Sequence, residues 1–436
     1  MKVLQWRKQS VIKLVIFLIA VLTLGYLVHW IVADITGRNC NDKSSKQILD
    51  SMCHLWEKNK VGGNLCEDIC KLHSIRYTSC LNYKRGKKVF NATWNMKAII
   101  MKSKKAYFED YKPLVTAAIT EDGKDKREKS GEEYPSFEDF AVKIQERIHE
   151  QLGKTGQRGQ FDMKRIFNDF WSTRFDDYFT NSYQKNAKVA GLNSINSLLQ
   201  QDEYVLMKQV QHSKYFPQIY GTCGHFYIME YVPQGEVLLP KIIGLGDSTT
   251  WNQRRLLAIK LLDFVHHFEH NLPEPLHLCD VKNKNFGITQ SGQVKAIDVD
   301  LAFFDKKLKQ FLSTEKCTKH SECDFFDCKG WCDFKTNQCT ERRINNNLQV
   351  FCAKIFSPHL VNGFRGLLRN PPAKLNSLFE KLLDDCRNPW NIQDRDIRLK
   401  TPDGTFWKLH RLLQQSSADY FPYEKQELRH GHDHEH

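Results

Sequence analysis

Three polar residues with suggestive spacing lie in the stretch HLCDVKNKNFGITQSGQVKAIDVD. Asn285 follows Asp280 by five positions, and Asp298 follows Asn285 by thirteen. A carboxylate can orient a hydroxyl group and accept its proton, while an Asn and a second Asp can hold Mg²⁺ beside a nucleotide. The spacing therefore indicates phosphoryl transfer, with Asp280 as the catalytic residue and with Asn285 and Asp298 as metal ligands.

The same stretch predicts a loop, a short hairpin and a strand that leads to Asp298. Lys282, two positions after Asp280, could steady the transferred phosphoryl group. For each residue taken singly, ordinary loop or strand polarity is the alternative. Asp300 is either a second metal ligand or a solvated carboxylate. Cys279 is better explained as a disulfide partner or a small buried residue than as a nucleophile, because no His and acid partners are identifiable by spacing.

Elements that could position these residues are predicted upstream. Residues 254–270 have the apolar spacing of a helix. The stretch HFYIMEYVPQGE from His225 predicts a strand that ends before the strand-breaking residues Pro233 and Gly235. The stretch around Glu203 resembles the end of the regulatory helix of a kinase, and AIIMK ending at Lys102 fits a buried strand, so these two residues could form the ion pair that holds nucleotide phosphates. Lys208 is the rival lysine, but it is too close to the strand from His225 to leave room for a helix.

With these pieces in place, the chain resembles the divergent protein kinase domain 1 family, which comprises cysteine-rich, single-pass, kinase-like proteins of the endoplasmic reticulum. The resemblance covers nearly the whole chain and rests on CEDIC, DEYVLM, YGTCGHFYIME, CDVKNKN, VKAIDVD and the cysteine run Cys317–Cys352. It implies an α+β, bilobal protein-kinase-like fold with disulfide-rich insertions, preceded by one transmembrane helix. It also implies ATP and Mg²⁺ as cofactors, with Lys102 and Glu203 in the nucleotide site.

The chain departs from the usual kinase pattern in several places. No G-x-G-x-x-G precedes Lys102, and only Gly86 lies in the hairpin expected there. The dipeptide Leu-Cys replaces the H-R of the catalytic loop, and Asp300 replaces the glycine of D-F-G. A disulfide-rich insertion stands where an activation segment should end in A-P-E, which argues against switching by loop phosphorylation. Region 161–200 lacks the calcium-binding pattern, so calcium is not expected.

An apolar segment near the N-terminus, Leu14–Ala33, contains 20 residues and no charge. A helix of that length rises about 30 Å, which matches the bilayer hydrocarbon thickness. A cleaved signal peptide is the alternative, but no small-residue cleavage site follows the segment. The basic residues before it place the N-terminus in the cytosol. We therefore expect a single-pass type II membrane protein of the endoplasmic reticulum with most of the chain lumenal, or of the Golgi as the alternative.

Cysteine usage agrees with a lumenal location. All 14 cysteines follow the apolar segment, and most cluster in 40–80 and in 317–352. Disulfides are the expected state, although their connectivity cannot be deduced from spacing. Zinc is the alternative for Cys66 with Cys70 or for Cys328 with Cys332.

The net charge and the glycosylation sequon constrain the function only weakly. The net charge of +13 would usually suggest binding to nucleic acid. A lumenal location argues against that partner. An acidic or phosphate-bearing ligand, or simply a soluble basic surface, explains the charge better. The sequon at Asn91 is compatible with glycosylation.

Six segments are predicted, in chain order: cytosolic tail 1–13, transmembrane signal anchor 14–33, lumenal cysteine-rich segment 34–82, N-lobe 83–232 with inserted helices 135–200, C-lobe 233–427 with a cysteine-rich insertion 317–352, and His-rich tail 428–436. The predicted function is transfer of the ATP γ-phosphate to protein or glycan hydroxyls in the secretory pathway. A pseudokinase that binds nucleotide or partners without transfer is the alternative, and a disulfide-braced structural protein is a remoter one.

Overall fold

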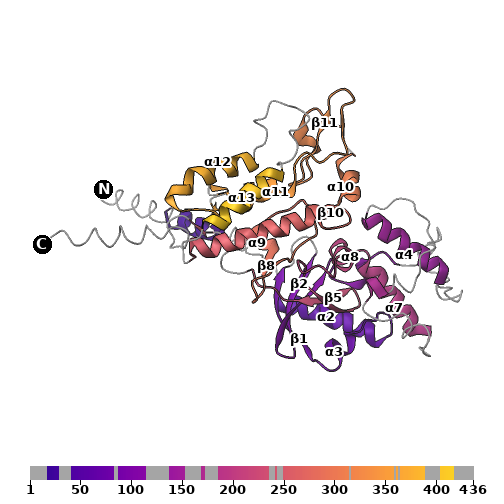
Figure 1. The fold of residues 1–436 in the computed structure, drawn as a ribbon. Coiled ribbons are helices and arrows are strands. Elements are labelled where there is room, and N and C mark those ends of the chain that lie inside the picture. The colour runs from indigo at the N-terminus through magenta and orange to yellow at the C-terminus, as the bar shows by residue number, and fades with distance from the viewer. Residues whose placement is uncertain are drawn as a thin grey trace, which may run out of the picture. The chain divides into compact units, whose positions relative to one another are not determined.

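The computed structural model (Figure 1) describes residues 17–28, 41–82, 87–113, 137–152, 168–171, 185–234, 241–242, 249–313, 316–357, 360–361, 364–387 and 403–416. The chain divides into two compact units. The first comprises Met1–Tyr134, Trp171–Gln201 and Tyr220–Glu230, and the second comprises Pro135–Phe170, Asp202–Ile219 and Tyr231–His436. Gly86, the tails 1–13 and 428–436, and most of 161–184 lie outside the described residues, and the predicted segment boundaries stay predictions.

The predicted membrane anchor is only partly described. Residues 17–28 are helical, whereas 14–16 and 29–33 lie outside the described residues. Within the part of the chain that the structure covers, no helix is both long and apolar enough to span a bilayer.

A five-stranded sheet forms the centre of the first unit, with strand order β1-β2-β3-β5-β4. Its strands are β1 (Ile75–Asn82), β2 (Lys88–Trp94), β3 (Lys97–Ser103), β4 (Ile219–Cys223) and β5 (Phe226–Glu230). Asn95 and Met96 both have positive φ, which is the two-residue turn that matches the twist of the hairpin between β2 and β3. The predicted strands that end at Lys102 and begin near His225 are confirmed as β3 and β5.

One face of this sheet is covered by helices α2 (Asp42–Glu57) and α3 (Cys66–Cys70), which share its apolar core. That core includes Met52, Phe90 and Met101. Side chains alternate between faces along a strand, so Lys102 belongs to the opposite face. The register pairs Asn91 with Ile100, the residue two positions before Lys102, so Asn91 and Lys102 share that opposite face. The unit also contains α7 (Lys185–Leu198) and the short η2 (Phe108–Asp110).

Helix α9 (Trp251–His270) is the longest helix that the structure describes in the second unit (Figure 1). Leu261, Phe264 and Phe268 on it are fully buried, as the apolar spacing predicts. The helix begins before the predicted start because Thr250 accepts a hydrogen bond from the Gln253 N–H while the Gln253 side chain bonds back to the Thr250 N–H.

The remaining elements of the second unit are short. Its other helices are α4 (Phe137–Leu152), α8 (Asp202–Gln209), α10 (Asp305–Leu312), α11 (Asn347–Phe351), α12 (Asn376–Arg387) and α13 (Asp403–Gln415), with single turns η5 (Asn283–Asn285), η6 (His320–Cys323), η7 (Cys352–Phe356) and η8 (Ala373–Leu375). Its strand pairs are β7 (Leu276–Leu278) with β10 (Ala302–Phe304), β8 (Phe286–Ile288) with β9 (Val294–Ala296), and β11 (Cys332–Asp333) with β12 (Gln338–Cys339). A further three-stranded sheet joins β6 (Lys241–Ile242), β14 (Phe364–Arg365) and β13 (Leu360–Val361).

Disulfides brace both units, and no cysteine among the described residues is free. Six pairs lie wholly within the described residues: Cys53–Cys70, Cys66–Cys223, Cys279–Cys328, Cys317–Cys332, Cys323–Cys339 and Cys352–Cys386. Cys80 is also disulfide-bonded. The zinc alternative is wrong, because the two members of each proposed ligand pair belong to different disulfides. The close sulfurs of Cys317, Cys323 and Cys339 are likewise oxidised and provide no thiolate.

Candidate active site

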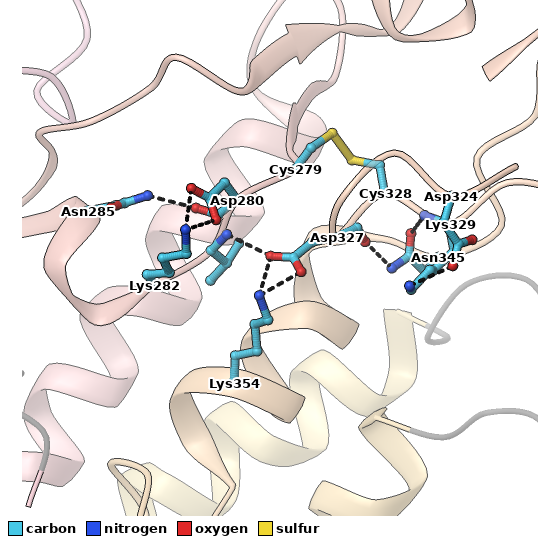
Figure 2. A network of polar contacts seen from close by, with 11 residues as sticks. Cys279, Asp280, Lys282, Asn285, Asp324, Asp327, Cys328, Lys329, Asn345 and Lys354 are labelled. Atoms are coloured by element: carbon cyan, nitrogen blue, oxygen red, sulfur yellow. Dashed lines mark hydrogen bonds and ion pairs between the residues drawn. A yellow bond between two sulfur atoms is a disulfide. The ribbon is translucent and has the colours of Figure 1, made fainter. Parts of the chain in front are cut away.

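Asp280 lies on the loop that follows β7, as predicted. We call residues 279–285 the Asp280 loop. The ammonium group of Lys282 approaches both carboxylate oxygens of Asp280, at 2.6 Å and 2.8 Å (Figure 2). The side chains of Asp280 and Lys282 are 25% and 48% exposed, so this acid and base remain accessible to a substrate.

Asn285 closes the Asp280 loop at the end of η5. Its Nδ2 donates a hydrogen bond of 2.8 Å to the backbone oxygen of Asp280, and the residue is only 5% exposed (Figure 2). This bond assigns the orientation of the amide, because a carbonyl oxygen can only accept. The Oδ1 of Asn285 accepts no hydrogen bond from the described residues, so it is available as a metal ligand.

The hairpin of β8 and β9 explains the spacing between Asn285 and Asp298. Its register pairs Phe286 with Ala296, and the Ile297 N–H donates to the Asn285 backbone oxygen at 2.8 Å. Asn285 and Asp298 therefore flank the open end of one hairpin. The sequence separation of thirteen is taken up by two short strands and a turn, so the predicted short hairpin is confirmed.

An acidic group lies at the same place. Carboxylate oxygens of Glu203, Asp298 and Asp300 all lie within 4.8 Å of one another. Glu203 is 2% exposed on α8, Asp298 is half-buried and Asp300 is exposed. A divalent cation would offset the mutual repulsion of three carboxylates, and oxygen donors are those that Mg²⁺ prefers. Asp300 lies close enough to the other two carboxylates to join a metal site, and both alternatives left by the sequence stay predictions.

Lys102 is the predicted site residue that belongs to the first unit. It is 5% exposed on β3. Glu203 belongs to the second unit, and its ion pair with Lys102 stays a prediction. The rival, Lys208, lies within α8 and not on a strand, which agrees with its rejection; its ammonium group donates to Gln211, and burial lowers its pKa.

Residues from outside the Asp280 loop hold its backbone. Cys279 forms a disulfide with Cys328, and its N–H donates to the Leu301 oxygen at 2.8 Å. The Val281 N–H donates to Asp327 at 2.7 Å. The expectation that Cys279 is a disulfide partner and not a nucleophile is confirmed. Sequence reasoning missed Asp327, and the one available signal was that Cys279 lies outside both cysteine clusters.

The strand that leads into the loop is fixed by a buried polar network. Arg343 Nη1 lies 2.9 Å from Nδ1 of His277, and Nε2 of His277 lies 3.1 Å from Asp305. Because arginine can only donate, His277 accepts at Nδ1 and donates at Nε2. The hydrogen bond from His277, followed by that from Lys309, holds the pKa of Asp305 well below its usual range. Burial lowers the pKa of Arg343 to about 10.

Two family models match this chain. Residues 195–389 match the protein-kinase domain of FAM69. Residues 5–163 match the N-terminal cysteine-rich ER region of FAM69. Together the matches cover well over half of the sequence, and the first includes every candidate site residue except Lys102.

Proposed function

Because the chain belongs to the FAM69 family, the divergent protein kinase domain 1 family that its sequence resembles, we propose that this kinase-like protein transfers the γ-phosphate of ATP to hydroxyl groups of proteins or glycans in the secretory pathway. One observation carries the proposal. Asp280, Asn285, Asp298 and Glu203 come together within one compact unit, although Glu203 is distant in sequence.

The proposed roles follow from the contacts. Asp280 orients the attacking hydroxyl and accepts its proton, and Lys282 beside it balances negative charge as the phosphoryl group transfers. Asn285 and Asp298, with Glu203 or Asp300, would hold Mg²⁺. When bound, Mg²⁺ would neutralise charge on the nucleotide phosphates.

The cofactor assignment rests on donor chemistry. The proposed metal ligands are carboxylates and one amide oxygen, a set that suits Mg²⁺ and not zinc, which favours sulfur and nitrogen. We keep Lys102 as the proposed contact to nucleotide phosphates. It lies on the buried strand β3, where the sequence predicts the nucleotide lysine.

We also propose that Leu14–Ala33 anchors the protein as a single-pass type II segment with the catalytic unit in the lumen. The uncharged run and the basic residues before it support this orientation. The match to a cysteine-rich ER region supports an endoplasmic reticulum location, and the disulfides agree with an oxidising compartment. Nucleic acid is not among the proposed partners.

A pseudokinase is the second candidate function. The absence of G-x-G-x-x-G before Lys102 and the Leu-Cys pair before Asp280 favour it. In this case the same unit would bind nucleotide or a protein partner without transfer.

The full-length protein in detergent separates these candidates. Mg²⁺-dependent ATP binding is measured by calorimetry, and phosphoryl transfer is measured with labelled ATP. We expect Asp280→Ala to lower transfer by about 100-fold or more while ATP still binds. Lys282→Ala should also lower transfer, whereas Lys284→Ala, an exposed lysine in the same loop, should not.

The outcomes differ clearly. Binding without transfer in the unmodified protein would refute the kinase and support the pseudokinase. Absence of both ATP binding and transfer would refute the kinase and the nucleotide-binding form of the pseudokinase. Equal effects of the Lys282 and Lys284 substitutions would refute the specific role of Lys282.

A further inference from the structure

We infer that Asp327, in the cysteine-rich insertion (Cys317–Cys352), is a positioning residue that fixes the Asp280 loop in its working geometry. This inference rests on the proposed function, because it explains how the same site is held. It assigns to the insertion a task at the site beyond bracing the fold.

Asp327 contacts the residues on both sides of Asp280. Its carboxylate accepts a hydrogen bond of 2.7 Å from the Val281 N–H, and its own N–H donates to the Cys279 oxygen at 2.8 Å. Val281 and Cys279 are 1% and 0% exposed, so these contacts are shielded from water. Asp280 therefore projects from a backbone that one residue holds on both sides.

A covalent bond reinforces the same contact. Cys328, the neighbour of Asp327, forms the disulfide with Cys279, the neighbour of Asp280. The two segments are therefore joined once by a disulfide and twice by hydrogen bonds within three residues of chain. The disulfide therefore restrains any displacement of the insertion that would break the two hydrogen bonds.

Asp327 is itself held in place. The Lys354 ammonium group lies 2.6 Å from its carboxylate, and Asn345 Nδ2 donates to its backbone oxygen at 2.8 Å. The Asp327 side chain is only 14% exposed. Its carboxylate therefore bridges Lys354 on η7 and the backbone of the Asp280 loop (Figure 2).

The backbone immediately before Asp327 is strained. Phe326 has a φ of 53°, although it is a bulky residue and 51% exposed. Left-handed backbone at such a residue persists only where surrounding contacts enforce it, and it concentrates at functional sites. The reciprocal backbone hydrogen bonds between Phe325 and Cys328 enforce this turn, which directs Asp327 toward the loop.

A permanent carboxylate has a different consequence from a regulatory phosphate. Segments that need phosphorylation are ordered only after a new anion pairs with a cation. Here the Asp327 carboxylate and the Lys354 cation are encoded in the chain. The Asp280 loop is thus held without a modification step.

The test uses the full-length protein with Asp327→Ala, the isosteric Asp327→Asn, and Asp324→Ala as the matched control. Asp324 lies in the same insertion and pairs with Lys329 at 2.7 Å, without contact to the Asp280 loop. Steady-state kinetics give kcat and KM separately, and hydrogen exchange reports the Val281 amide.

We expect Asp327→Ala to lower kcat by about 10- to 100-fold with KM for ATP nearly unchanged, because a misplaced catalytic group weakens only the chemical step. The Val281 amide should exchange at least about tenfold faster. Asp327→Asn should be milder, since its amide oxygen can still accept from Val281. Asp324→Ala should match the unmodified protein in both measurements.

The proposed phosphoryl transfer and the proposed role of Asp327 can be refuted independently. If the unmodified protein transfers no phosphate, the proposed function fails, and the exchange of Val281 in Asp327→Ala and Asp327→Asn still decides whether Asp327 holds the loop. Unchanged Val281 exchange would overturn the inference. Equal loss of kcat in Asp324→Ala would also overturn it, because general weakening of the insertion would then explain the effect. If Asp327→Ala does not fold, Asp327→Asn carries the same comparison.

Discussion

The first unit should lose stability on mild acidification because of one buried histidine. His225 is 1% exposed at the turn between β4 and β5, and its Nε2 donates to the Ala106 oxygen at 3.1 Å. Its Nδ1 has no hydrogen-bond partner among the described residues. Protonation would create a buried N–H with no acceptor, and burial lowers the pKa of His225 to about 4.

The sign and size of the effect follow from linkage. The pKa of His225 is lower in the folded state than its ordinary value of 6.5, so the unfolded chain binds the proton more readily. The stability is fully present above about pH 6.5 and is lost as the pH falls toward 4. Between pH 7.5 and pH 5, this one group should reduce the free energy of unfolding by about 2 kcal/mol.

Native-state hydrogen exchange of the amides in β5, corrected for intrinsic rates, measures this change within the first unit. His225→Gln keeps an N–H donor for Ala106 but cannot titrate, so its pH dependence should be smaller by about 2 kcal/mol. His54→Gln, an exposed histidine of the same unit, is the matched control. The reasoning fails if His225→Gln and the unmodified protein lose stability in parallel, or if NMR gives His225 a pKa near 6.5.

Three further predictions concern the metal site, glycosylation and one disulfide. Asp298→Asn should weaken Mg²⁺ affinity by about tenfold or more and Asp300→Asn by less, because Asp300 is more exposed; calorimetry with Mg²⁺ would contradict this if both variants bind as the unmodified protein does. We expect no glycan at Asn91, because a glycan would occupy the sheet face that carries the proposed nucleotide lysine. The mass that a glycosidase removes should therefore be the same in Asn91→Gln as in the unmodified protein. A difference in that mass, found in protein that binds nucleotide, would disprove the prediction. The double substitution Cys66→Ala and Cys223→Ala removes a disulfide whose cysteines are 157 positions apart, and it should lower the free energy of unfolding by up to about 5 kcal/mol. An unchanged melting temperature would contradict this prediction.

Locally encoded features were predictable from the sequence. The apolar spacing of 254–270 predicts a helix because each turn of a buried helix repeats its apolar face. The hairpin between Asn285 and Asp298 is equally local, since a turn at Gly292 joins two adjacent strands. The strand that ends at Lys102 follows from a short run of apolar residues.

Contacts between distant segments were not predictable in the same way. The bond between Val281 and Asp327 joins residues 46 positions apart, and nothing near either residue indicates the other. The partner of Cys279 was one of several cysteines, and spacing does not determine connectivity. Glu203 was expected beside a lysine, but its place beside Asp298 and Asp300 depends on how α8 packs in the second unit.

Two departures from the kinase pattern coincide with new contacts, so neither by itself indicates a lost activity. Asp300 replaces a glycine and joins the acidic group of Glu203 and Asp298. Cys279 replaces the arginine before the catalytic Asp and ties that loop covalently to Cys328. For the missing glycine-rich loop the described residues decide nothing, because Gly86 lies outside them. The choice between kinase and pseudokinase therefore depends first on whether nucleotide binds, and only then on whether Asp280 acts on it.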